Sequence, residues 1–346
     1  MRDATARASW TISAMMFVVA TTVSAQPEGG ARLPVFDVHL HALAADAQGP
    51  PPLGMCTPVR LPTWDPQRPY AETFLSVFKE PACDDPIWSP MDDEELLRRT
   101  LDELEEHHVF GVLSADLERG RAWAEAAPGR FVRGLGFNLA AAPPPPDELR
   151  RLVEAGEVEV LSEVTNQYSG IAPDDPRMEP YWALAEELDL PVGIHVGTGP
   201  PGSPYLGSPG YRAAAHSALT MEPVLARHPK LRVYLMHAGY PLLEDLLALL
   251  YTHPQVHVGI GVIVYTQPRE AFYRFLRGIV EAGFAKRVMF GSDQMVWPEV
   301  IGRSIRVIEE APFLSAEQKR DILYGNAARF FRFDEEEIAR HHGRGE

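Results

Sequence analysis

The feature that most limits the possible folds of this chain is a regular alternation of short apolar runs with amphipathic helical patterns. Runs rich in β-branched residues predict strands, and apolar residues spaced three and four apart predict helices. Eight strand-like runs occupy residues 33–41, 109–114, 131–138, 158–164, 192–197, 231–238, 256–264 and 287–293. Helical patterns cover 92–107, 147–155, 179–188, 221–228, 242–251, 270–282 and 298–310, and a last helix is expected over 315–333. Such an alternation predicts an α/β protein with a parallel sheet.

Eight strand-helix repeats favour a closed (β/α)₈ TIM barrel over an open, doubly wound sheet. An open sheet would place a glycine-rich phosphate turn after an early strand, but Gly134 and Gly136 lie inside the third run. Two long insertions follow the first and fifth strands, at 42–90 and 197–219. In a barrel, both would lie at the carboxyl ends of strands, where catalytic loops are found.

The N-terminus has the pattern of a secretory signal peptide. Arg2 and Arg7 precede an apolar run at 14–20, and Val-Ser-Ala at 23–25 forms a small-residue cleavage site. The run is shorter than the roughly 20 residues of a membrane span. We expect export to the periplasm or the exterior, and a cytosolic chain with an N-terminal leader is the alternative. The expected parts are a signal peptide at 1–25, a linker at 26–32, a barrel domain at 33–333 and a tail at 334–346.

The chain contains two cysteines, Cys56 and Cys83, both within the first insertion. In an oxidising compartment, two cysteines in one loop suggest a disulfide. Two unrelated buried thiols are the alternative. Two sulfurs this far apart do not suggest a cysteine zinc site.

The formal net charge of −16 argues against binding to nucleic acid or to an anionic membrane, because both present negative phosphate groups. A small-molecule substrate is the expected partner. The sequence contains no signal from which an oligomeric state is read.

Polar residues break the apolar pattern at the carboxyl ends of five predicted strands. They are His39 and His41 in the first, Glu163 in the fourth, His195 in the fifth, His237 in the sixth and Asp293 in the eighth. His39 and His41 are two residues apart, so they face the same side of a strand. In a barrel, all six side chains would converge near the axis.

Buried imidazoles and carboxylates need partners, since an unpaired polar group costs several kcal/mol. A divalent metal supplies that partner, and histidine and carboxylate ligands suit zinc. Manganese, iron or cobalt would also accept these ligands. Asp37 is expected to face away and brace the first strand, and His216 in the second insertion is a candidate for the wall of the substrate pocket.

The motif at 37–41 (Asp-Val-His-Leu-His), followed in order by His195, His237 and Asp293, resembles the amidohydrolase superfamily. The likeness is greatest to the amidohydrolase-related branch that includes aminocarboxymuconate-semialdehyde decarboxylase. It extends over about 33–333, and includes Met-Phe-Gly-Ser-Asp at 289–293 and Asp-Ile-Leu-Tyr-Gly-Asn-Ala at 321–327.

This resemblance implies one metal, usually zinc, on His39, His41, His195 and Asp293, with His237 as a catalytic acid/base or water-orienting residue. Glu163 is instead similar to the strand-four glutamate that bridges two metals in TatD-like hydrolases. In that case, His195 and His237 would bind the second ion. The number of metals, one or two, therefore stays open.

The leading functional hypothesis is a metal-dependent hydrolase that acts on an ester, lactone or amide. Asp293 would accept a proton from water and His237 would stabilise the developing oxyanion. The alternative is a metal-dependent decarboxylase of the same fold, which needs a cation such as Arg60 or Arg212 for the substrate carboxylate. A metal-binding or solute-binding protein without catalysis is the third possibility.

Overall fold

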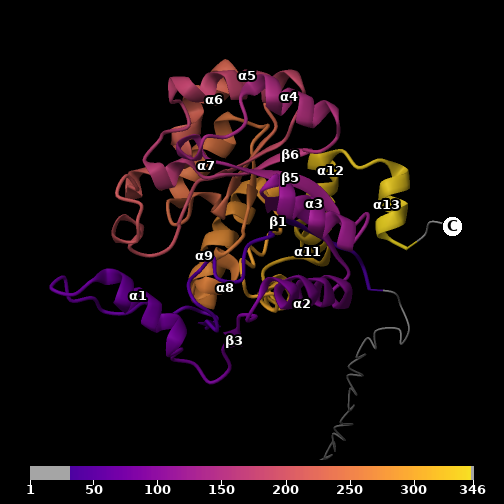
Figure 1. Ribbon diagram of the computed structural model, residues 1–346. Coiled ribbons are helices and arrows are strands. Elements are labelled where there is room, and N and C mark those ends of the chain that lie inside the picture. Colours follow the sequence, from indigo (N-terminus) through magenta and orange to yellow (C-terminus); the bar gives the residue numbers. More distant parts are fainter. Residues whose placement is uncertain (1–31, 344–346) are drawn as a thin grey trace, which may run out of the picture. The chain divides into compact units, whose positions relative to one another are not determined.

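The computed structural model describes residues 32–343, and the chain from Leu33 onward forms one compact unit. Its centre is a sheet of eight strands, each parallel to its neighbours, with helices around it (Figure 1). In sheet order, the strands are β1 (Val35–His41), β4 (Val109–Ala115), β5 (Phe131–Phe137), β6 (Val160–Val164), β7 (Val192–His195), β8 (Val233–Met236), β9 (His257–Gly259) and β10 (Val288–Met289).

Backbone hydrogen bonds join the first and last strands of this sheet. Val38 N donates to Phe290 O at 2.9 Å, and Asp293 N donates to His39 O at 2.8 Å. The sheet is therefore a nearly closed barrel, as the eight repeats predict.

The outer helices lie between successive strands along the chain, except α10, which follows the last strand. They are α2 (Asp93–Glu106), α3 (Leu117–Ala126), α4 (Pro146–Glu154), α5 (Glu179–Glu187), α6 (Glu222–Arg227), α7 (Leu243–Thr252), α9 (Arg269–Ile279) and α10 (Val300–Glu309). Helix α2 begins where the sequence indicates, because the Asp92 side chain accepts a hydrogen bond from Glu95 N at 2.8 Å. Helix α3 is not predicted from its sequence, since it buries Trp123 and lacks a repeating apolar stripe.

The predicted seventh strand, 256–264, is wrong in its second half. Strand β9 ends at Gly259, and the short helix α8 (Ile263–Thr266) follows. The chain turns because it passes directly beside the predicted site. A Cβ atom at Gly261 would lie 2.9 Å from His39 Nδ1 and 3.1 Å from Asp293 Cβ, so this close approach requires glycine.

The first insertion forms an arm with its own small structure. Along the chain, helix α1 (Tyr70–Lys79) comes between β2 (Gly54–Met55) and β3 (Ile87–Trp88), which pair as an antiparallel ribbon. The helix projects from the barrel in Figure 1. The predicted disulfide between Cys56 and Cys83 is present. It closes the base of the arm, where the chain leaves and rejoins the barrel.

The C-terminal segment departs from the prediction. The expected helix over 315–333 consists of α11 (Ala316–Arg320) and α12 (Asn326–Phe331), with a π-helical turn between them. The predicted tail contains helix α13 (Glu335–His341). His341 is buried, with its ring 4.1 Å from that of Phe110 and its Nδ1 3.0 Å from Tyr324 Oη. Residues 335–341 of the predicted tail therefore form a helix that contacts the barrel through the ring of His341.

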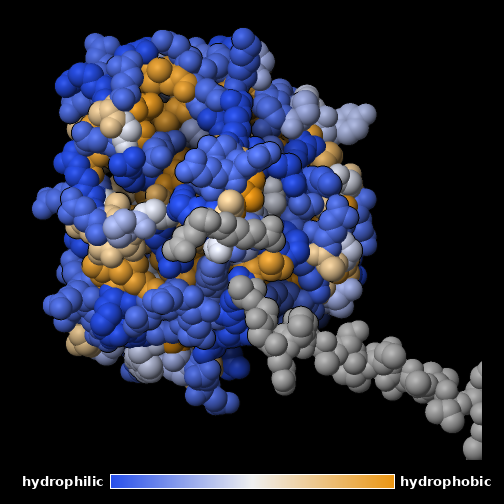
Figure 2. Space-filling view, turned by 90° about the vertical axis from the view of Figure 1, so that its right-hand side faces the viewer, coloured by the Kyte–Doolittle hydropathy of each residue, from blue (hydrophilic) through white to orange (hydrophobic). Residues whose placement is uncertain are grey.

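The predicted signal peptide and almost all of the linker, residues 1–31, lie outside the described residues, as do 344–346. Within 32–343, no helix combines the length and apolar character that crossing a membrane requires. The face in Figure 2 is mainly hydrophilic with small apolar patches, in keeping with the net charge of −16.

We predict that His341 makes the fold sensitive to acid. Burial, followed by the nearby charge of Arg340, lowers the pKa of His341 from 6.5 to about 4. Between these pH values the unfolded chain binds a proton that the folded chain does not, so stability is complete above about pH 6.5 and falls toward pH 4. In His341→Phe, this loss should shrink by about 2 kcal/mol in urea titrations at pH 7 and pH 4.5.

Tyr324→Phe is the matched control, since it removes the hydrogen bond to His341 but keeps the imidazole. It should retain the acid sensitivity of the unmodified chain. An equal loss of stability in His341→Phe and in the unmodified chain would contradict the assignment.

Candidate metal centre

The structure brings all six predicted polar residues together at the carboxyl ends of five barrel strands. They are His39 and His41 of β1, Glu163 of β6, His195 of β7, His237 directly after β8 and Asp293 after β10. All except His41 are buried, and the side chain of His41 is only 12% exposed. The convergence expected from strand ends is therefore present, whereas the role of each residue as a ligand stays a prediction.

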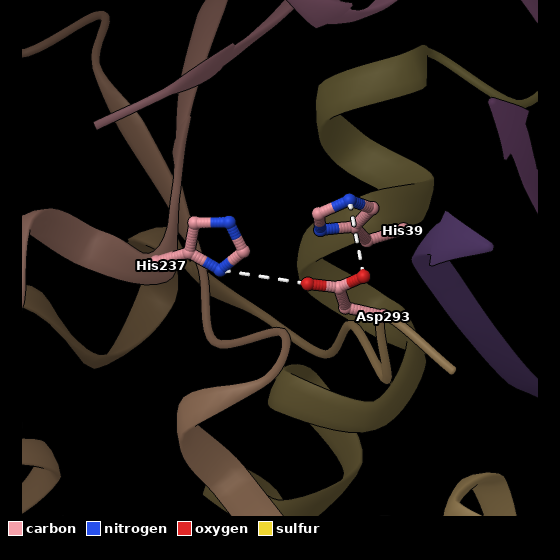
Figure 3. Close-up of side chains that lie close together, drawn as sticks. All are labelled: His39, His237 and Asp293. Carbon is pink, nitrogen blue, oxygen red and sulfur yellow. Dashed lines mark ion pairs between the residues drawn. The ribbon is translucent and has the colours of Figure 1, made fainter. Parts of the chain in front are cut away.

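Asp293 lies at one side of this cluster, against the two histidines of β1. Its Oδ1 is 3.0 Å from His41 Nε2 and 3.8 Å from His39 Nε2. Figure 3 shows the carboxylate of Asp293 between His39 and His237, and its Oδ2 is 3.9 Å from His237 Nδ1. One carboxylate thus faces three imidazoles.

Glu163 lies at the centre of the cluster and faces both halves of it. Its Oε1 is 2.6 Å from His195 Nδ1 and 3.5 Å from His237 Nε2. Its Oε2 is 3.8 Å from His39 Nε2. The two oxygens therefore point toward different sets of imidazoles.

Three groups of side chains within the cluster have ligand atoms within 4.8 Å of one another. These groups are His39 with His237 and Asp293, His39 with His41 and Glu163, and Glu163 with His195 and His237. Because the groups share members, the cluster offers adjoining positions for a cation.

Asp37 holds the backbone that carries the cluster, as the sequence predicts for a bracing residue. Its carboxylate accepts hydrogen bonds from His39 N at 2.9 Å and from Ser292 N at 3.0 Å. Burial raises the pKa of Asp37 to about 7, although these donors oppose the rise. Asp37 thus joins β1 to the segment that carries Asp293.

Gln294 is a site residue that the sequence reasoning misses. Its side-chain oxygen accepts from His41 N at 3.0 Å, and its amide donates to His41 O at 2.6 Å. Gln294 is completely buried, and this pair of bonds fixes the backbone of His41. The available signal was a polar residue directly after the strand-end Asp293.

The protonation states of the cluster suit metal binding. Burial lowers the pKa of both His39 and His195, which favours neutral imidazoles. Burial alone would raise the pKa of Glu163 and Asp293, but the neighbouring imidazoles outweigh it and hold both pKa values below their usual range. Burial also opposes protonation of His41 and His237, but hydrogen bonds to Asp293 and Glu163 outweigh it and raise both pKa values. Ligands must be neutral imidazoles and ionised carboxylates, so a cation would displace the remaining protons.

Buried nitrogens without a partner provide the test of whether a metal fits. Among the described residues, His39 Nδ1, His39 Nε2 and His195 Nε2 are buried and accept or donate no hydrogen bond. Leaving buried polar atoms unpaired costs about 1–3 kcal/mol each. His237 Nδ1, in contrast, pairs with Gly261 O at 2.9 Å, which orients its ring as outer partners of metal-bound histidines do. The donor set therefore fits a divalent cation.

Residues of the loop after β6 and of the second insertion lie against the His195 side of the cluster. The ring of Tyr168 lies 4.7 Å from that of His195 and stacks on Tyr211 at 5.4 Å. The Tyr211 hydroxyl accepts from Gly199 N at 2.7 Å. The ring of His216 lies 5.4 Å from Tyr211, and its buried Nε2 has no partner among the described residues. The place of His216 in the wall of a substrate pocket stays a prediction.

The two insertions also contact each other. Tyr70 of α1 donates a hydrogen bond to Pro201 O at 2.8 Å. The rings of Trp64 and Tyr205 are 4.9 Å apart. A hydrogen bond and an aromatic contact therefore join the arm to the second insertion.

Comparisons with known proteins agree with the geometry. The family model described as amidohydrolase matches residues 36–333. No curated protein sequence matches the chain significantly. Several solved structures resemble it.

An uncharacterized TIM-barrel protein from Bordetella bronchiseptica has a TM-score of 0.57 at 16% identity, covering 90% of this chain and 100% of that one. The 5-carboxyvanillate decarboxylase of Sphingomonas paucimobilis has a TM-score of 0.54 at 17% identity, covering 87% and 100%. A probable 2-pyrone-4,6-dicarboxylic acid hydrolase from Acinetobacter baumannii has a TM-score of 0.55 at 15% identity, also covering 87% and 100%. At such identities these likenesses concern the fold. Together with the family match over most of the chain, they place it: this protein belongs to the amidohydrolase family.

Proposed function

We propose that this protein is a metal-dependent hydrolase that cleaves a small ester, lactone or amide. The observation that carries the proposal is the central position of Glu163, whose two oxygens face different imidazoles. A carboxylate in this position suits a pair of ions, and paired ions are typical of hydrolytic sites. Zinc is the metal that we propose, from the histidine and carboxylate ligands.

In this proposal, Glu163 bridges two positions. His39, His41 and Asp293 would hold the first ion together with Glu163, and His195 and His237 would hold the second. A bound divalent ion would supply an activated water and would polarise the substrate carbonyl.

Asp293 would act as the general base. Its pKa is held below the usual range by His39 and His41 in spite of burial, so the carboxylate is ionised and able to accept a proton. Tyr265 donates to Asp293 O at 3.0 Å, which fixes the backbone from which the carboxylate projects. Asp293 would then return the proton to the leaving group.

Tyr168 would donate a hydrogen bond to the substrate. Burial and the nearby charge of Glu163 raise its pKa well above 10, so the hydroxyl stays protonated and remains a donor. His216 Nε2 is buried and has no hydrogen-bond partner among the described residues. Both lie on the His195 side of the cluster and suit a polar, uncharged substrate.

A decarboxylase of the same fold is the second candidate function, and several structural neighbours are named as decarboxylases. That reaction requires a cation for the substrate carboxylate. Arg212 Nη1, however, donates to the backbone oxygens of Pro209 and Tyr211 at 2.7 and 2.8 Å, so it braces its own loop. A protein that binds a metal or solute without catalysis is the third candidate, and turnover of any substrate would exclude it.

We predict that the purified chain binds two metal ions and that Glu163→Ala binds close to one. The alanine variant removes both oxygens of the proposed bridge, so the second ion would keep only His195 and His237 as ligands and should be lost. Metal content per chain, measured by elemental mass spectrometry of the acid-digested protein, tests this. Glu159→Ala is the matched control because Glu159 lies near the start of the same strand, paired with Arg133 at the surface.

A content of one ion that is unchanged in Glu163→Ala would contradict the bridge. The decarboxylase and the hydrolase would then be equally well supported. Absence of bound metal after reconstitution would remove the proposal altogether.

We expect Asp293→Asn to lower kcat for ester or lactone hydrolysis by at least about 100-fold, because an amide cannot accept the proton. The assay compares a panel of aryl esters, lactones and anilides at equal metal loading. Asp102→Asn, on the exposed face of α2, is the control and should keep full activity. Undiminished hydrolysis by Asp293→Asn would contradict its role. Release of CO₂ from an aromatic acid without ester turnover would favour the decarboxylase.

We also propose that the chain is exported. The disulfide between Cys56 and Cys83 supports an oxidising compartment, and residues 14–25 have the pattern of a signal peptide. Expression of the full chain in a Gram-negative host should yield periplasmic protein whose mass lacks residues 1–25. Cytoplasmic protein of full mass would contradict export.

A further inference from the structure

A cavity lies at the base of the arm, outside the cluster of proposed metal ligands. Its volume is about 490 Å³, which is within the range of small-molecule sites. Its walls come from the arm, from the segment around α8 and α9, and from α10. The polar groups among the lining residues are Thr57, Asp85, Tyr265, Gln267, Arg269, Arg303, Arg306 and Glu310.

Three of the lining side chains are guanidinium groups, and two are carboxylates. The lining therefore has a net charge of +1 by this count, in a chain whose net charge is −16. Such a local reversal of charge attracts an anion.

Two of the three arginines have partners that are themselves open to solvent. Arg303 contacts Asp85 at 2.5 Å, and the Asp85 side chain is 87% exposed. Arg269 contacts Glu310 at 3.0 Å, and the Glu310 side chain is 61% exposed. Exposed ion pairs of this kind are worth little, so an anion within the cavity can share or replace them.

The side chain of Arg306 makes no hydrogen bond or ion pair with the described residues, which makes it the available cation of the cavity. Gln267 and Thr57 add neutral polar groups, and Arg303 Nη1 donates to Thr57 Oγ1 at 3.1 Å. Guanidinium groups match carboxylates in shape and can donate two parallel hydrogen bonds. The cavity volume of about 490 Å³ is larger than one inorganic ion would occupy.

We propose that this cavity binds a small organic anion with one or more carboxylate groups, at a site separate from the metal centre. Arg306 and Arg269 hold the carboxylates, and Val264 and Val307 face the carbon chain. The inference does not depend on the proposed hydrolase activity.

The position of the cavity connects the arm with the metal centre. Tyr265 lines the cavity, and its hydroxyl donates to Asp293 O. Arg303 donates hydrogen bonds to Thr57 and Asp85, which lie close in sequence to the two cysteines of the disulfide at the base of the arm. An occupant would therefore lie between the segment that anchors the arm and the segment that positions Asp293.

Isothermal titration of the metal-loaded chain with succinate, at low ionic strength, tests the proposal. We expect saturable binding to one site, and Arg306→Gln should weaken it about tenfold, the usual loss for one charge-assisted bond. Arg274→Gln is the matched control, because Arg274 is exposed on the same helix as Arg269 but does not line the cavity. It should leave the affinity unchanged.

Equal affinity in Arg306→Gln and the unmodified chain would overturn the proposal, since succinate would then bind elsewhere, for example at the metal. Lack of saturable binding would overturn it as well. Inorganic phosphate is titrated in parallel, and phosphate affinity equal to or above that of succinate would overturn the assignment to a carboxylate. Arg269→Gln provides a second variant, with the same expected loss.

Discussion

The closure of the barrel between β1 and the segment after β10 is the constraint on which the metal centre depends. Asp37 accepts backbone N–H groups from both sides of this seam, and Asp293 N donates to His39 O. These bonds bring the histidines of β1 and the carboxylate of Asp293 to one rim. Gly261 completes the seam, because any side chain there would collide with His39. The seam thus fixes the spacing of the proposed ligands.

Burying four imidazoles and two carboxylates together is costly, and the structure offsets only part of the cost internally. Hydrogen bonds and charges within the cluster keep Glu163 and Asp293 ionised. Among the described residues, both nitrogens of His39 nevertheless lack a hydrogen-bond partner. A divalent cation would satisfy these nitrogens and balance the carboxylates in one step, so the incomplete pairing of the cluster is what suits it to hold metal.

The strand ends were predictable from sequence because a barrel strand is apolar where it packs, so a polar residue at its carboxyl end points to a site. His195 and Asp293 were recognised in this way, as was the bracing role of Asp37. Gln294 was not recognised, since it acts through hydrogen bonds to the backbone of His41. The periodicity of apolar residues does not predict such hydrogen bonds. The shortness of β9 was missed for a related reason: the chain turns at Gly261 to avoid His39, a contact between residues far apart in sequence. Helix α13 was missed because its burial depends on partners in other parts of the chain.

The insertions are where substrate preference would be set, and their contacts could not be inferred from sequence. Composition identified them as long, proline-rich loops. It did not predict that Tyr70 would contact Pro201 or that Arg303 would bind the base of the arm. These contacts matter because the cluster is nearly enclosed: the side chains of His41, Glu163 and Asp293 are 12%, 10% and 8% exposed. His41 is the most open of these three, so the cluster is most accessible at its His41 side. The arm is joined to the barrel at the cavity that Tyr265 and Arg303 line, so an occupant of that cavity would contact both the base of the arm and the tyrosine that binds the backbone of Asp293.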